Sequence, residues 1–424
     1  MSESMTMKMH DVCESLFLHD LMRLSTHFTN TIDWARFGIL LAQFQDQFAG
    51  ISQALYEFLE QEEKEEFLKW FLLKWGEINI LPQSEIDEYD RKYASYDHYR
   101  WGKRKINGIE TIVVDLQEQY GFDFALDRDY KTVADGAWLL CDFLHDQYSF
   151  KKTHVREKDV IIDAGAYLGE SALFFAHQLR GQCTVHSFEI SPPNYQTLLD
   201  NLAINGLKNI HPNRLALSDK SGEQFVFTHD RGKSSVDRKV GGTSDMCTVE
   251  TVTLDDYVAR HTLERVDFIK MDIEGAEMAT LRGAVQTIKQ FKPRLAISIY
   301  HLPEDTVSIP RIIKELVPEY HFHFNWYAKR KGSDAILYAS IDEQPKEMKM
   351  KRVPVFDHKL FNEVIYRSLF EMDDLKAQLK EKHEKKCQEL EQRIETIHNS
   401  KVYGLVRWYW RTISAAKKLF KKNS

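Results

Sequence analysis

Cysteine is scarce in this sequence and its positions do not form pairs. The 424 residues include five cysteines that form neither a CxxC pair nor a cluster with histidine: Cys13, Cys141, Cys183, Cys247 and Cys387. A disulfide framework or a structural zinc site is therefore not expected, and a reducing cytosol is the simplest setting.

Long apolar runs and a strong charge imbalance are also missing. No stretch of about 20 apolar residues occurs, so no segment is expected to span a bilayer. The first residues, MSESMTMKMHDVCESLF, carry acidic residues and no apolar core, which does not fit a secretory signal. The formal net charge is −7, so a general nucleic-acid binder is not expected. The 43% of hydrophobic residues are enough for a substantial core and more than one module.

The spacing of the apolar residues changes several times along the chain. Residues 1–85 have apolar positions at steps of three and four, as in Phe37, Leu40, Leu41 and Phe44, and predict a helical module. Residues 155–342 alternate short apolar runs with helical stretches, which predicts a doubly wound α/β sheet. The other expected segments are a connecting region, a linker, a coiled-coil-like helix and a basic amphipathic helix: 86–154, 343–360, 361–400 and 401–424.

The turn DAGAYLG ends the first predicted strand of the α/β region. Asp163 closes the strand, Gly165 and Gly169 are four residues apart, and a helix is expected to start near Glu170 or Ser171. Glycine allows a sharp turn and lets a ligand approach the backbone beside free helix N-terminal amides. A dinucleotide fold would have GxGxxG, and its middle glycine is absent here. The turn therefore favours a ligand without a pyrophosphate, although an empty structural turn is an alternative.

Two further predicted strands end on acidic residues. TVHSFEISP ends on Glu189, where a carboxylate can accept hydrogen bonds from a ribose diol. VDFIKMDIEGAE ends with Lys270, Asp272, Glu274 and Glu277, more ionisable groups than solubility requires. Simple charge neutralisation by Lys270 and a first-turn helix position for Glu277 are the structural alternatives.

The motifs DAGAYLGE, SFEISP, ALSD, TLDDYV, IKMDIEGAE and ISIYHLPED follow one another between residues 155 and 342. In this order they resemble the FkbM-type S-adenosylmethionine-dependent methyltransferases. The resemblance implies a class I methyltransferase fold (Rossmann-like) and transfer of a methyl group to an oxygen, commonly a hydroxyl of a sugar or polyketide product. It implies S-adenosylmethionine as cofactor, with the turn of Asp163, Gly165 and Gly169 around its methionine part, Glu189 on its ribose, and Ser218 and Asp219 near its adenine.

A hydroxyl acceptor calls for a base or a metal, because a protonated sugar hydroxyl is a weak nucleophile. His301, after the last of these predicted strands, has an ordinary pKa near neutrality, about 6.5, and is expected to accept the proton. Asp272 is expected to do so itself, to orient a base or to hold a cation. His321 and His323 face one side of a probable strand, but no third ligand can be named, so no metal site is assigned.

The terminal segment 401–424 has no acidic residue and seven lysines and arginines. On a helix, its cationic face, apolar face and flanking Trp408 and Trp410 suit peripheral contact with an anionic membrane, and a helix docked on the enzyme itself is the alternative. Residues 361–400 allow self-association. The preferred function is a cytoplasmic methyltransferase acting on a glycan or glycolipid hydroxyl at the inner membrane surface. The other hypotheses are an inactive scaffold with this fold and a nucleotide-dependent oxidoreductase.

Overall fold

A computed structural model of the chain describes residues 15–28, 31–94, 99–127, 130, 146–230, 233–235 and 246–342, together with Val364, Arg367 and Glu371. It divides into two compact units, which are described separately: residues 83–346, and residues 1–82 with 347–424. The segments expected to be a linker, a coiled coil and a basic amphipathic helix lie outside the described residues, apart from those three single positions. Among the described helices, none is long and apolar enough to cross a bilayer.

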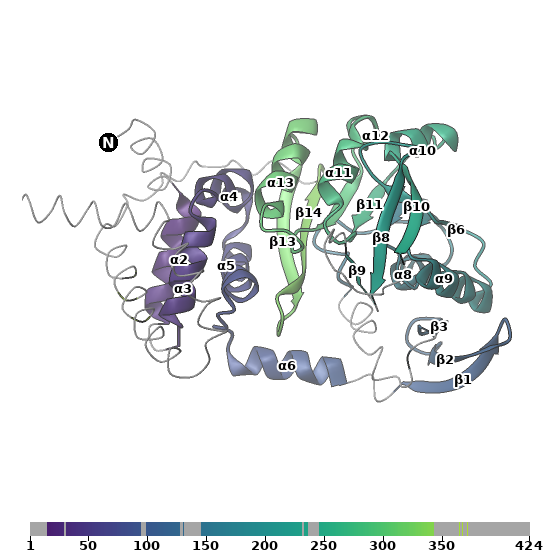
Figure 1. The fold of residues 1–424 in the computed structure, drawn as a ribbon, viewed down its shortest axis with the longest axis horizontal. Coiled ribbons are helices and arrows are strands. Elements are labelled where there is room, and N and C mark those ends of the chain that lie inside the picture. The colour runs from purple at the N-terminus through teal and green to yellow at the C-terminus, as the bar shows by residue number, and fades with distance from the viewer. Residues whose placement is uncertain are drawn as a thin grey trace, which may run out of the picture. The chain divides into compact units, whose positions relative to one another are not determined.

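The unit of residues 1–82 and 347–424 is helical in its described part (Figure 1). Its elements are α2 (Leu16–His27), α3 (Trp34–Phe44), α4 (Phe48–Ala54), the short 3-10 helix η1 (Tyr56–Phe58) and α5 (Gln61–Gly76). The side chains of Ser15 and Asp33 cap the first two helices, and Glu60 and Glu63 form a capping box at α5. The spacing of Leu55 and Phe58 also predicts an α-helix, but Phe58 lies in the 3-10 helix η1 and Leu55 directly precedes it.

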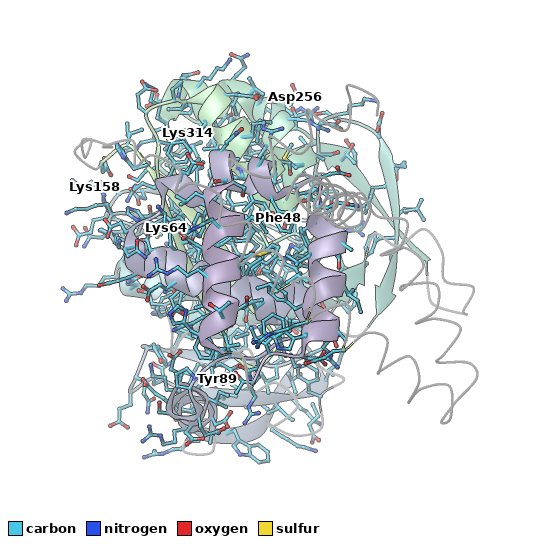
Figure 2. The ribbon with its side chains drawn as sticks, turned by 90° about the vertical axis from the view of Figure 1, so that its left-hand side faces the viewer. Phe48, Lys64, Tyr89, Lys158, Asp256 and Lys314 are labelled. Atoms are coloured by element: carbon cyan, nitrogen blue, oxygen red, sulfur yellow. The ribbon has the colours of Figure 1, made fainter. Side chains whose placement is uncertain are left out.

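Aromatic side chains fill the core of this helical unit. Phe17 contacts the rings of Phe48, Tyr56, Phe67 and Phe71 at centroid distances between 4.9 and 6.1 Å. Phe48, which is labelled in Figure 2, is 2% exposed. Edge and tilted ring contacts of this kind stabilise a helix bundle beyond the area that they bury.

The second unit is built on a seven-stranded sheet in the order β13-β14-β12-β11-β4-β5-β6. The strands are β4 (Val160–Ala164), β5 (Thr184–Phe188), β6 (Ile210–Asn213), β11 (Phe268–Met271), β12 (Arg294–Ser298), β13 (His321–Ala328) and β14 (Ser333–Ser340). The pairs from β6 to β12 are parallel, and β14 is antiparallel to both of its neighbours. Numbered along the chain, the order is 6-7-5-4-1-2-3, which is the class I methyltransferase sheet, so the expected fold class is confirmed.

The central strands form because apolar residues dominate β4, β11 and β12, whereas β5 also buries the polar side chains of His186 and Ser187. Every residue of β11 and β12, and all but the first of β4 and β5, is buried, as expected for parallel strands covered on both faces. The helices of this unit are α6 (Gln83–Ala94), α8 (Glu170–Gln178), α9 (Pro192–Asn205), α10 (Leu254–Arg260), α11 (Glu277–Arg282), α12 (Val285–Phe291) and α13 (Asp305–Leu316). In Figure 1, α10, α12 and α13 gather on one side of the unit, and α8 and α9 on the other.

Two smaller sheets join this unit. β1 (Arg100–Ile106), β2 (Ile109–Leu116) and β3 (Phe122–Ala125) form an antiparallel sheet inside the segment expected to be a connecting region. Its buried side chains share one hydrophobic core with α8, α9 and the central strands. The other small sheet has the order β7-β10-β8-β9, from β7 (Ala216–Leu217), β8 (Gln224–Asp230), β9 (Lys233–Ser235) and β10 (Met246–Val252).

Two details of the expected layout are wrong. The pattern of residues 276–291 predicts one helix, but these residues form two, α11 and α12, and the break comes at Gly283. A Cβ there would lie 2.0 Å from the carbonyl oxygen of Ser218, so the chain can pass Ser218 only with a glycine. Ser218, expected from the order of the motifs to follow the third strand of the main sheet, does not follow it. That strand, β6, ends at Asn213, and Ser218 follows β7 of the other small sheet.

Candidate active site

The candidate site lies at the carboxyl ends of β4, β5, β11 and β12. The chain runs from β4 to β5 on one side and later returns to β11 on the other side of β4. The crevice between β4 and β11 is therefore the topological switch point, where open α/β sheets bind ligands. Asp163 is the last residue but one of β4, Glu189 follows β5, and Asp272 follows β11.

The turn after β4 is shaped by two glycines with positive φ. Gly165 has φ +81° and Gly169 has φ +93°, a region that side chains other than glycine rarely enter. A Cβ on Gly165 would lie 1.8 Å from the carbonyl oxygen of Asp272, and one on Gly169 would lie 2.5 Å from Leu198. Gly165 thus lets the ends of β4 and β11 approach each other, and Gly169 lets α8 start against α9.

The buried side chain of Asp163 stabilises this turn. Its carboxylate is 0% exposed, accepts hydrogen bonds from Ser171 Oγ at 2.9 Å and Ser187 Oγ at 3.2 Å, and lies 3.2 Å from Lys270 Nζ. Lys270 Nζ in turn donates to the carbonyl oxygen of Gly165 at 2.6 Å. Lys270 therefore pairs with Asp163 and ties β11 to the turn, whereas neutralisation of Asp272 was the expected structural alternative.

Glu189 lies beside the same turn with its carboxylate held by backbone amides. Oε2 accepts from Tyr167 N at 3.0 Å, Oε1 accepts from Ser191 N at 2.8 Å, and Asn194 Nδ2 lies 3.4 Å from Oε1. Burial raises its pKa to about 7, although these hydrogen bonds act in the opposite direction. Each carboxylate oxygen can accept more than one hydrogen bond, so acceptor capacity remains for a ligand hydroxyl.

Ser218 and Asp219 are held mainly by the neighbouring sheet. Ser218 N donates to Val252 O at 3.0 Å, and its hydroxyl reaches Asp219 at 3.4 Å. Asp219 is exposed. These contacts fix Ser218 beside β10, and they do not by themselves bring the pair to Glu189 or to the glycine turn.

A second polar cluster surrounds Asp272 and His301. Asp272 accepts hydrogen bonds from Tyr148 Oη at 3.3 Å and Tyr300 Oη at 3.2 Å. His301 Nε2 lies 3.3 Å from Asp272 Oδ1, and His301 Nδ1 lies 2.9 Å from Glu277 Oε1. Asp272, Glu277 and His301 each offer a ligand atom within 4.8 Å of the other two, and among the described residues they are the metal-competent group.

The electrostatics of this cluster change the expected role of His301. Burial alone would lower its pKa, but the contacts with Asp272 and Glu277 raise the pKa well above the usual value. Burial would raise the pKa of Asp272, but His301 holds it below its usual range. In this arrangement the imidazole carries a proton at neutral pH, so the ordinary pKa expected for it as a base does not apply.

The structure adds residues that sequence reasoning missed or ranked low. Tyr148 comes from the segment before the α/β region, and no sequence signal marks it. Tyr300 stands beside His301 in the quoted motif and was not singled out. Glu277, one of the four ionisable residues expected near this strand end, for which a first-turn helix position was the structural alternative, is 0% exposed and accepts from Ile273 N at 2.9 Å. It therefore belongs to the cluster and not to the solvated face.

The match to known families covers most of this sheet. Residues 163–325 match the family model described as the methyltransferase FkbM domain. The chain contains an FkbM methyltransferase domain. The expected family is therefore confirmed for residues 163–325, which form a domain of the S-adenosylmethionine-dependent methyltransferase class.

Several individual proteins are similar to the FkbM domain and its surroundings. Methyltransferase sdnD of Sordaria araneosa is 29% identical over 157 residues, which cover 29% of this chain and 59% of that protein. The hexuronic acid methyltransferase AglP of Haloferax volcanii is 24% identical over 159 residues, which cover 38% of this chain and 63% of that protein. The crystal structure of an FkbM methyltransferase from Methylobacillus flagellatus KT has 18% sequence identity and a TM-score of 0.43, covering 72% of this chain and 60% of that one. The chain thus spans less than two thirds of the length of each of these three proteins.

Proposed function

We propose that this protein transfers the methyl group of S-adenosylmethionine to a hydroxyl oxygen of a glycan, a glycolipid or a related secondary product. The observation that carries the proposal is the pairing, at one switch point, of a carboxylate beside a glycine turn with a second polar cluster after the adjacent strand. The carboxylate beside the glycine turn suits a nucleoside, and the polar cluster suits an acceptor hydroxyl.

The residues around the glycine turn fit the cofactor. Glu189 is oriented by the backbone amides of Tyr167 and Ser191 and would hold the ribose hydroxyls. Gly165 and Gly169 shape the backbone that would border the methionine part. Asp163 acts through Lys270 as a positioning residue for this turn, since its carboxylate is fully buried. When bound, the cofactor supplies an electrophilic methyl group on a sulfonium.

On the acceptor side, Asp272 would receive the hydroxyl. Its side chain is 21% exposed, and it is ionised at neutral pH because its pKa is lowered. It can therefore accept the hydrogen bond of an incoming hydroxyl and orient that oxygen, and such positioning supplies much of the acceleration of a displacement. Tyr148 and Tyr300 keep Asp272 in place. His301 adds a positive charge that stabilises the carboxylate.

The glycan acceptor is the finer part of the proposal. It rests on the family resemblance and on the similarity to AglP, which is named as a hexuronic acid methyltransferase. Incubation with methyl-labelled S-adenosylmethionine and a panel of sugars, uronic acids and glycolipids would test it. We expect label on an oxygen of a sugar, and transfer only to nitrogen or carbon acceptors would contradict the proposal.

Cofactor binding is the decisive experiment for the activity itself. Calorimetric titration of the full chain with S-adenosylmethionine and S-adenosylhomocysteine should show saturable binding, and NAD should show none. Glu189→Gln should weaken binding at least tenfold, because the amide loses an acceptor. Glu223 is an exposed acid directly before β8, and Glu223→Gln serves as the control that should keep the affinity. Folded protein that binds no sulfur nucleoside would support the scaffold hypothesis, and unchanged affinity in Glu189→Gln would reject the ribose assignment.

The basic segment 401–424 supports a proposal about location. Its composition would bring a cytoplasmic enzyme to an anionic inner membrane surface, where glycolipid acceptors are assembled. Removing residues 401–424 should abolish cosedimentation with anionic vesicles and leave cofactor affinity unchanged. Undiminished vesicle binding would contradict this. Self-association through residues 361–400 is tested by sedimentation of a chain lacking them.

A further inference from the structure

The cluster after β11 has more negative than positive charge. The carboxylates of Asp272, Glu274 and Glu277 surround one imidazole, with His301 Nε2 at 3.3 Å and 3.6 Å from the first two and Nδ1 at 2.9 Å from the third. Asp305, which is 1% exposed, interacts electrostatically with both Glu277 and His301. Even a protonated imidazole therefore faces several carboxylates.

The nearest lysine restores the balance only in part. Lys270, two residues before Asp272, helps to lower the pKa of Asp272, but its ammonium pairs with Asp163 at 3.2 Å and donates to Gly165 O. Uncompensated charge is costly to bury, and proteins usually meet that cost with a counter-ion or a metal.

Buried polar atoms in the cluster also lack aligned partners. Glu277 Oε2 and both ring nitrogens of His301 have no hydrogen bond of acceptable geometry, although the side chains are 0% and 7% exposed. Glu277 uses its other oxygen for Ile273 N. Buried polar atoms without partners are rare in native proteins, and an ion is one of the few explanations.

We propose that Asp272, Glu277 and His301 bind a divalent cation that takes the place of the imidazole proton, with Glu274 at the mouth of the site. One ligand atom from each of the three lies within 4.8 Å of the others, and ligands on a shared ion stand roughly 3 to 4 Å apart with bonds of about 2.1 Å. Two carboxylates suit Mn²⁺ or Mg²⁺, and the imidazole favours the transition ion, Mn²⁺, of the two. The side chain of Glu274 is 44% exposed, so the site is open on that side to water or to an acceptor.

The cation would have a defined use in the proposed reaction. A hydroxyl bound to it would lose its proton more easily, to water at the open side of the site. The resulting oxygen would be the stronger nucleophile that bonds to the methyl carbon as the S–C bond breaks and S-adenosylhomocysteine leaves. This use rests on the proposed function, but the binding of the cation does not, so the two can be tested separately.

Titration of chelator-treated full chain with Mn²⁺, followed by electron paramagnetic resonance, tests the site. We expect one saturable Mn²⁺ per chain that Mg²⁺ displaces. Asp272→Asn, Glu277→Gln and His301→Gln should each weaken it at least tenfold. Glu315→Gln, which changes an exposed acid on α13, should leave the affinity unchanged. In the wild-type protein, pulsed spectra should show coupling to an imidazole nitrogen, which does not depend on whether a variant folds.

Three results would overturn the inference: no saturable Mn²⁺ in folded protein, no nitrogen coupling, or folded variants with wild-type affinity. Parallel titration with S-adenosylhomocysteine separates this from the proposed function. If the nucleoside binds and Mn²⁺ does not, the cation site alone is wrong. If neither binds, the proposed function is wrong as well.

Discussion

At the scale of single residues, Gly165 joins the two halves of the site. Its φ of +81° and the 1.8 Å from a Cβ to the carbonyl oxygen of Asp272 are separate obstacles to any side chain. Gly181 also has a positive φ, +73°, but a Cβ there would meet nothing within 4 Å. Gly181→Ala should therefore cost about 1 kcal/mol of unfolding free energy from its backbone conformation alone.

Gly165→Ala should cost at least about 2 kcal/mol, because the backbone of β11 must also move. It should weaken S-adenosylhomocysteine binding, whereas Gly181→Ala should not. Urea unfolding and calorimetry of both variants would measure this. Equal stability losses in the two variants would show that the strand ends can separate freely.

Glu189 also predicts how cofactor binding depends on pH. With a pKa of about 7, its carboxyl is largely protonated below pH 7 in the free protein, whereas accepting ribose hydroxyls requires the ionised form. Binding then releases a proton, so affinity should fall as the pH drops from 8 to 6, approaching about tenfold per pH unit. Adenosine is the suitable ligand, because it lacks the titrating amino acid part of the cofactor.

The neighbouring charges define the control. Lys270 and Glu170 both interact with this region, and burial raises the pKa of Glu170 to about 8. Both remain in Glu189→Gln, so the pH dependence that disappears in this variant belongs to Glu189. A pH profile for adenosine that is the same in both proteins would assign the proton to another group.

At the scale of elements, Asn201 on α9 connects the small antiparallel sheet to the cofactor turn. Its side chain accepts from Ala125 N at 2.6 Å and donates to Ala125 O and Leu168 O. Asn205, one turn later, makes the equivalent pair of bonds to Asp123 but does not reach the turn. The two asparagines therefore form a matched pair.

Asn201→Ala leaves buried backbone groups without partners and should lower the unfolding free energy by about 2 to 3 kcal/mol. It should also weaken cofactor binding, because Leu168 lies in the glycine turn. Asn205→Ala should cost about 1 kcal/mol and keep the affinity. If both variants bind S-adenosylhomocysteine like the wild type, the sheet supports the fold and not the turn.

The elements also show what the sequence could predict. β4, β5, β11 and β12 are short runs with buried apolar residues, and the first three have an acidic residue at or directly after their ends, so their positions and the edge they share followed from the pattern. The break between α11 and α12 did not, because it depends on the distance from Gly283 to Ser218, which lies far away in the sequence. The hydrogen bond between Tyr148 and Asp272 could not be predicted for the same reason, because the two residues lie far apart in the sequence.

The antiparallel sheet β1–β3 is a different case. Its hairpin turns at Asn107 and Gly108, which have φ +50° and +84°. An Asn-Gly pair between two extended segments is a strong hairpin signal, and it could have located β1 and β2 from the sequence. The sheet was missed because the basic strand Arg100–Ile106 is exposed along most of its length and lacks an apolar run.

At the scale of the whole molecule, the boundaries of the two units predict which fragment folds. Residues 83–346 contain the whole main sheet and the core that it shares with β1–β3. Residues 155–342, the extent of the α/β pattern in the sequence, lack side chains of that core, namely Ile112, Val114, Leu116, Phe122, Phe124 and Leu126, all of which are nearly or fully buried. Removing them exposes an apolar surface on α8 and α9, which lowers stability and favours aggregation.

The fragment 83–346 should therefore unfold cooperatively and bind S-adenosylhomocysteine with the affinity of the full chain. The fragment 155–342 should be insoluble or should lack a cooperative transition. Calorimetric melting and titration of both fragments would decide, with the full chain as the reference. A stable, cofactor-binding 155–342 fragment would mean that the β1–β3 sheet is an addition to a complete domain. Failure of 83–346 alone would mean that the helical unit contributes to the stability of the methyltransferase domain.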